Sequence, residues 1–199
     1  MIYLLLSIVF NAVLFVIIKL FAKFNIDALQ ALVVNYFVAF LVGLFFLDTN
    51  IVPKEIINED WFTGSVLLGF IFISTFYVTT ITSQRNGLSV ASVASKMSVI
   101  IPITLGVILY NESLGFVKII GILLALIAVY FTSKKETGEV QNANNLLFPV
   151  LVFLGAGTID ASLKYLQTYH VPANQIGLFS TVTFFCAFTV GVLTILFLT

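Results

Sequence analysis

The chain is a succession of apolar runs of about 18 to 24 residues, separated by short polar stretches. A helix needs about 20 apolar residues to cross the hydrocarbon core of a bilayer, so each run has the length of one membrane span. An outer-membrane β-barrel would instead show alternating segments of about ten residues. The pattern therefore predicts an all-α protein that crosses the bilayer several times.

The composition supports a membrane protein and excludes several other classes. Of the 199 residues, 60% are hydrophobic and 9% are charged, and the mean hydropathy is +1.14. This leaves too little charged surface to cover a water-soluble globule. The formal net charge is zero, so we expect no nucleic-acid partner. We expect a multi-pass protein of the cell membrane, with the lipid bilayer as its surroundings.

Seven apolar runs are expected to form transmembrane helices. Their approximate bounds are residues 2–21, 27–47, 62–83, 89–110, 114–132, 146–168 and 175–199. The longest polar break, SKKETGEVQNANN at residues 133–145, has the composition of a linker. Trp61 lies just before the third run, where tryptophan is typical of the headgroup level. We expect Trp61 to anchor that helix at the membrane surface.

The linker divides the seven helices into five and two, which suggests a repeat. With one residue of slippage, the first forty or so residues pair Asn11 with Asp160 and Gly43 with Gly191. A five-helix unit places its second copy upside down, as in the inverted repeats of many secondary transporters. We therefore expect one complete five-helix unit over residues 1–133, a linker over 134–145, and the first two helices of an inverted second unit over 146–199.

The third to fifth runs carry a group of motifs that are informative together. They are a glycine-containing third helix, the segment ASVAS at the start of the fourth, the pair Ile101-Pro102, the turn Asn111-Glu112, and Gly121 early in the fifth helix. With these motifs the first 133 residues resemble the EamA-like family of the drug/metabolite transporter (DMT) superfamily. The resemblance implies a ten-helix carrier, built from two five-helix halves, for amino acids or other small metabolites.

The sequence departs from the pattern of that family at its end, because it stops after the seventh run. The resemblance implies three further helices. We expect the sequence to be a fragment of a longer carrier. The alternative is a shortened protein that completes itself by association with a partner such as a second copy.

Lys96 is the first candidate for a substrate contact. Ser89, Ser92 and Lys96 recur at helical spacing, so they share one face of the fourth helix. A lysine at the centre of a membrane helix costs about 2.5 to 3.5 kcal/mol on insertion scales, which makes it a functional hypothesis by default. We predict that Lys96, with Ser92 beside it, binds a carboxylate or phosphate. The alternative is a lysine that snorkels to the interface.

Asp160 is the second candidate. It lies in one stripe of the sixth helix with Gly157, Lys164 and Gln167, and its spacing to Lys164 favours an intrahelical ion pair. We predict that Asp160 couples transport to protons or cations, or binds a substrate amine, with Lys164 beside it. The alternative is a structural pair that locks the helix in the bundle.

The remaining candidates have weaker or structural roles. Asn11 and Asn35 are candidate substrate contacts, and the alternative for both is an interhelical hydrogen bond worth about 0.6 kcal/mol. Pro102 is expected to kink the fourth helix and open space beside it. Glu112 is expected to favour the dipole at the start of the fifth helix, and Gly121 to allow close packing.

Catalysis is not expected. His170 is the single histidine, and no HExxH zinc motif or GxSxG elbow occurs. Cys186 is also single, so a cysteine-based metal site is excluded within one chain. We expect no cofactor and no metal. The favoured function is a secondary transporter that exports a small polar metabolite by alternating access. The alternative is a non-transporting membrane assembly subunit or a small channel.

Overall fold

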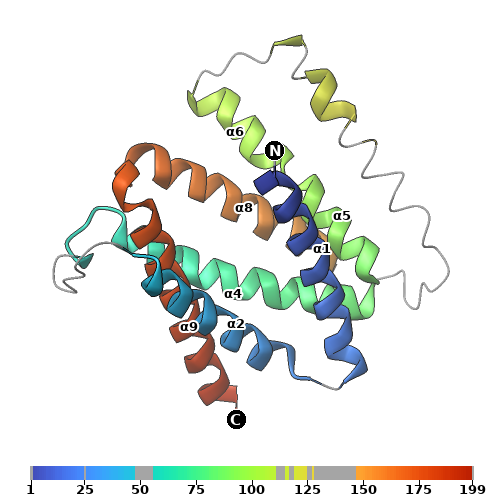
Figure 1. Ribbon diagram of the computed structural model, residues 1–199. Coiled ribbons are helices and arrows are strands. Elements are labelled where there is room, and N and C mark those ends of the chain that lie inside the picture. Colours follow the sequence, from blue (N-terminus) through green and yellow to red (C-terminus); the bar gives the residue numbers. More distant parts are fainter. Residues whose placement is uncertain are drawn as a thin grey trace.

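The computed structural model describes residues 2–24, 26–47, 56–110, 115–116, 119–124, 127 and 147–198. Within these residues the structure is helical and contains no strand (Figure 1). The helices are α1 (Ile2–Lys23), α2 (Ala28–Phe45), α4 (Phe62–Arg85), α5 (Leu88–Met97), α6 (Ile100–Tyr110), α8 (Leu147–Tyr169) and α9 (Ile176–Leu198), with a short 3-10 helix, η1 (Ala173–Gln175), before α9.

Five helical segments of the described part are long and apolar enough to cross a membrane. They are Ala28–Phe45, Phe62–Arg85, Leu88–Ile108, Leu147–Tyr169 and Ala173–Phe197. The predicted all-α, polytopic membrane fold is therefore confirmed. The helix expected over residues 114–132 and the turn that contains Glu112 fall mostly outside the described residues.

Helix α4 is the centre of the bundle, because it packs against α2, α5, α8 and α9 (Figure 1). Glycines allow these helices to pack at short distances. Gly64 of α4 lies against Leu166 of α8, and a Cβ at Gly69 would lie 2.7 Å from the backbone nitrogen of Ala187 in α9. Helices in lipid gain little from the hydrophobic effect, so close packing of this kind holds them together.

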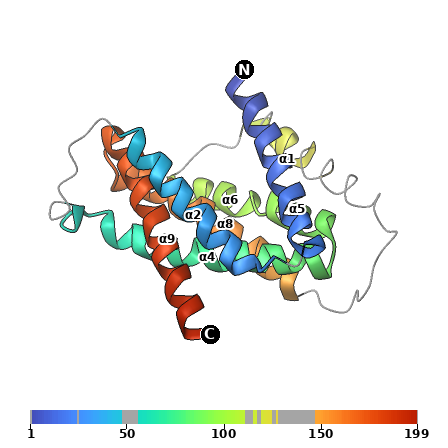
Figure 2. The same cartoon turned by 60° about the horizontal axis from the view of Figure 1, so that its bottom comes forward.

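Helices α2 and α9 lie side by side (Figure 2) and make two contacts that mirror each other. Gly43 of α2 faces Thr181 of α9, while Gly191 of α9 faces Val33 of α2. Gly43 and Gly191 stand 148 residues apart, and the same shift relates Val33 to Thr181. A shift of 148 residues therefore converts the contact of Gly43 with Thr181 into the contact of Gly191 with Val33.

Two aromatic pairs between α2 and α9 are related by the same shift of 148 residues. The Phe37 and Phe188 rings lie 5.1 Å apart, and the Phe40 and Phe185 rings lie 4.9 Å apart. A shift of 148 residues turns the first pair into the second. The segments YFVAFLVG at 36–43 and FFCAFTVG at 184–191 are identical at five of eight positions. The sequence repeat and the spatial contacts thus agree at this interface.

Trp61 is fully buried, so its predicted role as a headgroup anchor is wrong. Its indole Nε1 donates a hydrogen bond of 2.7 Å to Oε1 of Gln175, and Nε2 of Gln175 donates one of 3.1 Å to Oε1 of Glu59. The ring packs edge to face on Phe179 at 5.7 Å. An indole that finds both apolar contacts and an acceptor inside the protein has no need of the membrane interface.

Substitution of Gly69 tests the close approach of α4 and α9. We expect Gly69→Val to lower the free energy of unfolding by about 1 to 3 kcal/mol, because the new side chain overlaps backbone that cannot move alone. Gly121→Val is the matched control, since no described atom lies within 4 Å of a Cβ there. Thermal unfolding of the detergent-solubilised protein measures both. Equal losses in the two variants would contradict the packing described.

Substitution of Gln175 tests the buried hydrogen bond of Trp61. We expect Gln175→Ala to destabilise the protein by about 1 to 3 kcal/mol, because it leaves a buried indole N–H without its acceptor. Gln167→Ala removes the same group from an exposed position of α8, and a change within about 0.5 kcal/mol is expected. The fluorescence of Trp61, which is the single tryptophan, reports unfolding. A Gln175→Ala variant as stable as the control would show that the bond contributes nothing.

Candidate functional site

Lys96 and Asp160 come together from different membrane spans. Lys96 lies in the last turn of α5 and Asp160 in α8, two helices that pack against each other. The ammonium of Lys96 lies close enough to interact electrostatically with the carboxylate of Asp160. Both side chains are exposed on the surface of the described structure. The sequence predicted Lys164 as the partner of Asp160, whereas this interaction comes from another helix.

A break in the fourth span places Lys96 at a helix end. The expected continuous helix over residues 89–110 is divided into α5 and α6, with the turn at Ser98 and Val99. The cause is Pro102, which has no N–H for the carbonyl of Ser98 and whose ring crowds that oxygen. The amide of Ile101 donates to it instead, at 2.9 Å. The break therefore lies one turn before the proline.

The helix end suits a cation. The final carbonyl groups of a helix carry partial negative charge, so an ammonium in the last turn is stabilised there. The backbone carbonyl of Lys96 also accepts a bond of 3.4 Å from the amide of Val99 in the turn. Interrupted helices whose ends face a binding site are a common device of transporters.

Two glycines of α8 allow this helix to approach its neighbours closely. Gly155 lies against Thr75 of α4, and Gly157 lies against Ile101 of α6. Asp160 follows Gly157 by three residues, so it lies on nearly the same side of α8, next to α5. The glycines therefore let α8 pack closely against α4 and α6, while α8 also packs against α5.

The other predicted residues are more scattered. Ser92 is partly buried on α5, one turn before Lys96, and Lys164 is partly buried one turn after Asp160 on α8. Asn35 is exposed on α2, which packs mainly against α9 and α4. Asn11 belongs to α1, and its side chain lies outside the described part of the structure. The structure therefore groups Ser92, Lys96, Asp160 and Lys164 along the adjoining helices α5 and α8.

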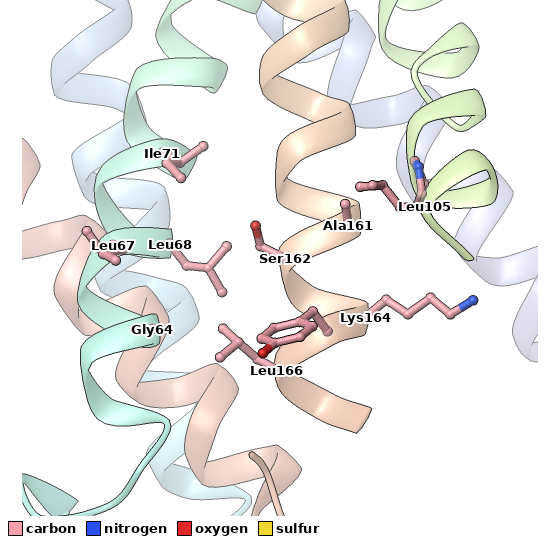
Figure 3. A pocket seen from close by; sticks show the side chains of 11 residues that line it. Gly64, Leu67, Leu68, Ile71, Leu105, Ala161, Ser162, Lys164 and Leu166 are labelled. Atoms are coloured by element: carbon pink, nitrogen blue, oxygen red, sulfur yellow. The ribbon is translucent and has the colours of Figure 1, made fainter. Parts of the chain in front are cut away.

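A cavity of about 370 Å³ lies between α4, α6 and α8 (Figure 3). Pro102, which was expected to open space beside the fourth helix, is one of its lining residues. Its lining is mostly apolar and consists of Gly64, Leu67, Leu68, Ile71, Pro102, Leu105, Ala161, Ser162, Lys164, Tyr165 and Leu166. The small side chains of Ala161 and Ser162 are visible in the sequence, but the helices that face them are not.

The charged side chains of these sites can bind small charged groups. Within the described residues, no group of three or more histidine, cysteine, aspartate or glutamate side chains could hold a metal ion. Lys96 of α5 and Asp160 of α8 offer one cation and one anion on adjoining helices. Such a pair can bind a group of either charge, or exchange a proton at the carboxylate.

Comparisons with known proteins agree with the expected family. No solved structure matches the chain. An uncharacterized protein of Haemophilus influenzae is 27% identical to it over 157 residues, which cover 75% of this chain and 53% of that protein. The chain spans about half the length of this curated relative.

The sequence profile of the EamA-like transporter family matches residues 1–134, about two thirds of the chain. The match includes all the motifs on which the resemblance was based, from the third helix to Gly121. Members of this family are transporters and not enzymes. The chain is therefore a multi-pass membrane protein that belongs to the EamA-like transporter family of the drug/metabolite transporter superfamily.

Proposed function

We propose that this protein is a secondary transporter that exports a small polar metabolite, such as an amino acid, across the cell membrane. The observation that carries the proposal is the exposed pair of Lys96 and Asp160 within two membrane spans. Charges that face hydrocarbon cost about 2.5 to 3.5 kcal/mol each on insertion scales. This face of α5 and α8 therefore borders water or protein, as the wall of a transport pathway does.

The two charges fit a zwitterionic substrate. Lys96 would bind the carboxylate of an amino acid, or the phosphate of a related metabolite, and Asp160 would bind its amine. Ser92 and Lys164 lie one turn from these groups and would complete the contacts. Asp160 is also our candidate for proton coupling, because a carboxylate in a span can release its proton when a cation or substrate amine approaches.

Alternating access is supported by the mirrored contacts of α2 and α9. A shift of 148 residues along the sequence exchanges the two glycine contacts of this interface. A two-fold axis between two inverted units requires such an exchange. In the proposed organisation, α5 belongs to the unit of residues 1–133 and α8 to the unit that begins at residue 146. Lys96 and Asp160 then join the two units, and a movement of one unit against the other would open or close the site. Further helices, or a second copy of the chain, would form the opposite wall.

Removal of either charge tests the proposal. We expect Lys96→Ala and Asp160→Asn each to lower export at least tenfold, equivalent to about 1.4 kcal/mol of lost interaction. If the two residues act as a unit, the double variant should be little worse than either single variant. The measurement is export of isotope-labelled amino acids from cells that express the complete gene, normalised to protein in the membrane.

Lys23→Ala is the matched control, because Lys23 is an exposed lysine at the end of α1. It should leave export unchanged. Normal export by both Lys96→Ala and Asp160→Asn would refute the site. If the unaltered protein moves no metabolite in a broad export screen, the transporter proposal fails, and an assembly subunit becomes the better explanation.

A further inference from the structure

The cavity between α4, α6 and α8 shares Lys164 with the proposed substrate site, but its other lining residues are not among the proposed substrate contacts. Asp160 and Ser162 are two residues apart in a helix of about 3.6 residues per turn, so they point to opposite sides of α8. Asp160 lies beside α5, whereas Ser162 lies between α8 and α4 with Leu68 opposite (Figure 3). The proposed transport leaves this cavity without a role.

The lining suits a ligand with one long apolar part and one anionic group. Leu67, Leu68 and Ile71 form the wall on α4, and Leu105 stands on the α6 side. The polar atoms come from α8, where Lys164 extends toward the α6 side of the cavity (Figure 3). A volume of about 370 Å³ falls within the range of about 300 to 1,000 Å³ that is typical of ligand pockets.

Lys164 lies near the end of α8. Lys164 is five residues before the end of α8 at Tyr169, a distance of about 7.5 Å along the helix. Tyr165 contacts Tyr169 and His170, with ring centroids 5.3 and 5.5 Å apart. Rings with polar tips gather at the membrane interface. We therefore expect Lys164 to lie near the lipid headgroups.

From the end near Lys164 the cavity continues toward the hydrocarbon. Gly64 and Ile71 both line it, and seven helical residues correspond to about 10 Å of depth. The cavity is also open at its side, because Leu67 is 62% exposed and Tyr165 is 44% exposed. A lipid chain can enter laterally from the bilayer without passing through the protein.

We infer that one acyl chain of an anionic membrane phospholipid occupies this cavity, with its headgroup against Lys164. The apolar walls of α4 and α6 receive the chain. Basic side chains between transmembrane helices at the membrane surface recognise anionic headgroups. The bound lipid fills the space between α4, α6 and α8 and stabilises their packing. Because Lys164 is also a proposed substrate contact, the inference is tested by the retention of lipid and not by export.

Competition between two lipids tests the headgroup. The protein is purified from membranes, incubated with equal amounts of phosphatidylglycerol and phosphatidylcholine that carry identical chains, and examined by native mass spectrometry. We expect preferential retention of phosphatidylglycerol, and a preference about fivefold smaller in Lys164→Gln, as for the loss of one basic residue at an anionic surface. Lys23→Gln removes a charge from an exposed position on α1 and should leave the preference unchanged.

Filling the cavity tests the acyl chain. Ala161→Phe should reduce retention of both lipids, whereas Val150→Phe, at a position of α8 that is 51% exposed and outside the cavity, should not. Ser162→Leu serves the same purpose if Ala161→Phe does not fold. Unchanged preference in Lys164→Gln, or full retention in a folded cavity-filling variant, would overturn the inference. So would an unaltered protein that retains neither lipid, as expected if other protein segments fill the cavity.

Discussion

Close packing between helices determines how the elements of this structure are arranged. Inside a bilayer, apolar side chains gain nothing by leaving lipid for protein, so helices associate where small residues let their backbones approach. Gly64, Gly69 and Gly155 bring α8 and α9 against α4, and Gly157 brings α8 against α6. This packing also brings α8, which carries Asp160, against α5, which carries Lys96. The candidate site is therefore a consequence of glycine positions that have no chemistry of their own.

A second constraint acts within a single span. Pro102 cannot donate to the carbonyl of Ser98, and the fourth span consequently breaks into α5 and α6. The break turns Lys96 from a residue in the middle of an apolar run into one at a helix terminus, where backbone carbonyls stabilise its charge. The local backbone geometry thus gives an otherwise costly cation a stabilising helix end, on a helix that packs against α8.

The sequence predicted the features that depend on local pattern. Run lengths gave the helices, and Lys96 and Asp160 stood out because charges in apolar runs are rare. The features that depend on which helices are neighbours were missed. Trp61 was expected at the headgroups, but Gln175 and Phe179 enclose it. The cation beside Asp160 comes from α5, which spacing along α8 cannot reveal. Pro102 was expected to open space beside the fourth helix and does line the cavity, but the walls that α4 and α8 contribute depend on packing between helices.

In the proposed transporter, the charged face of α5 and α8 borders water inside the membrane. The most direct measurement replaces Cys186 by alanine, introduces Lys96→Cys, and follows its reaction in membranes with a charged, water-soluble thiol reagent. Val38→Cys, at a position of α2 that is 50% exposed within an apolar span, is the reference for a lipid-facing thiol. We predict that the thiol at position 96 reacts at least tenfold faster than the thiol at position 38. This ratio of rates is equivalent to about 1.4 kcal/mol. Equal, slow reaction at both positions would contradict it.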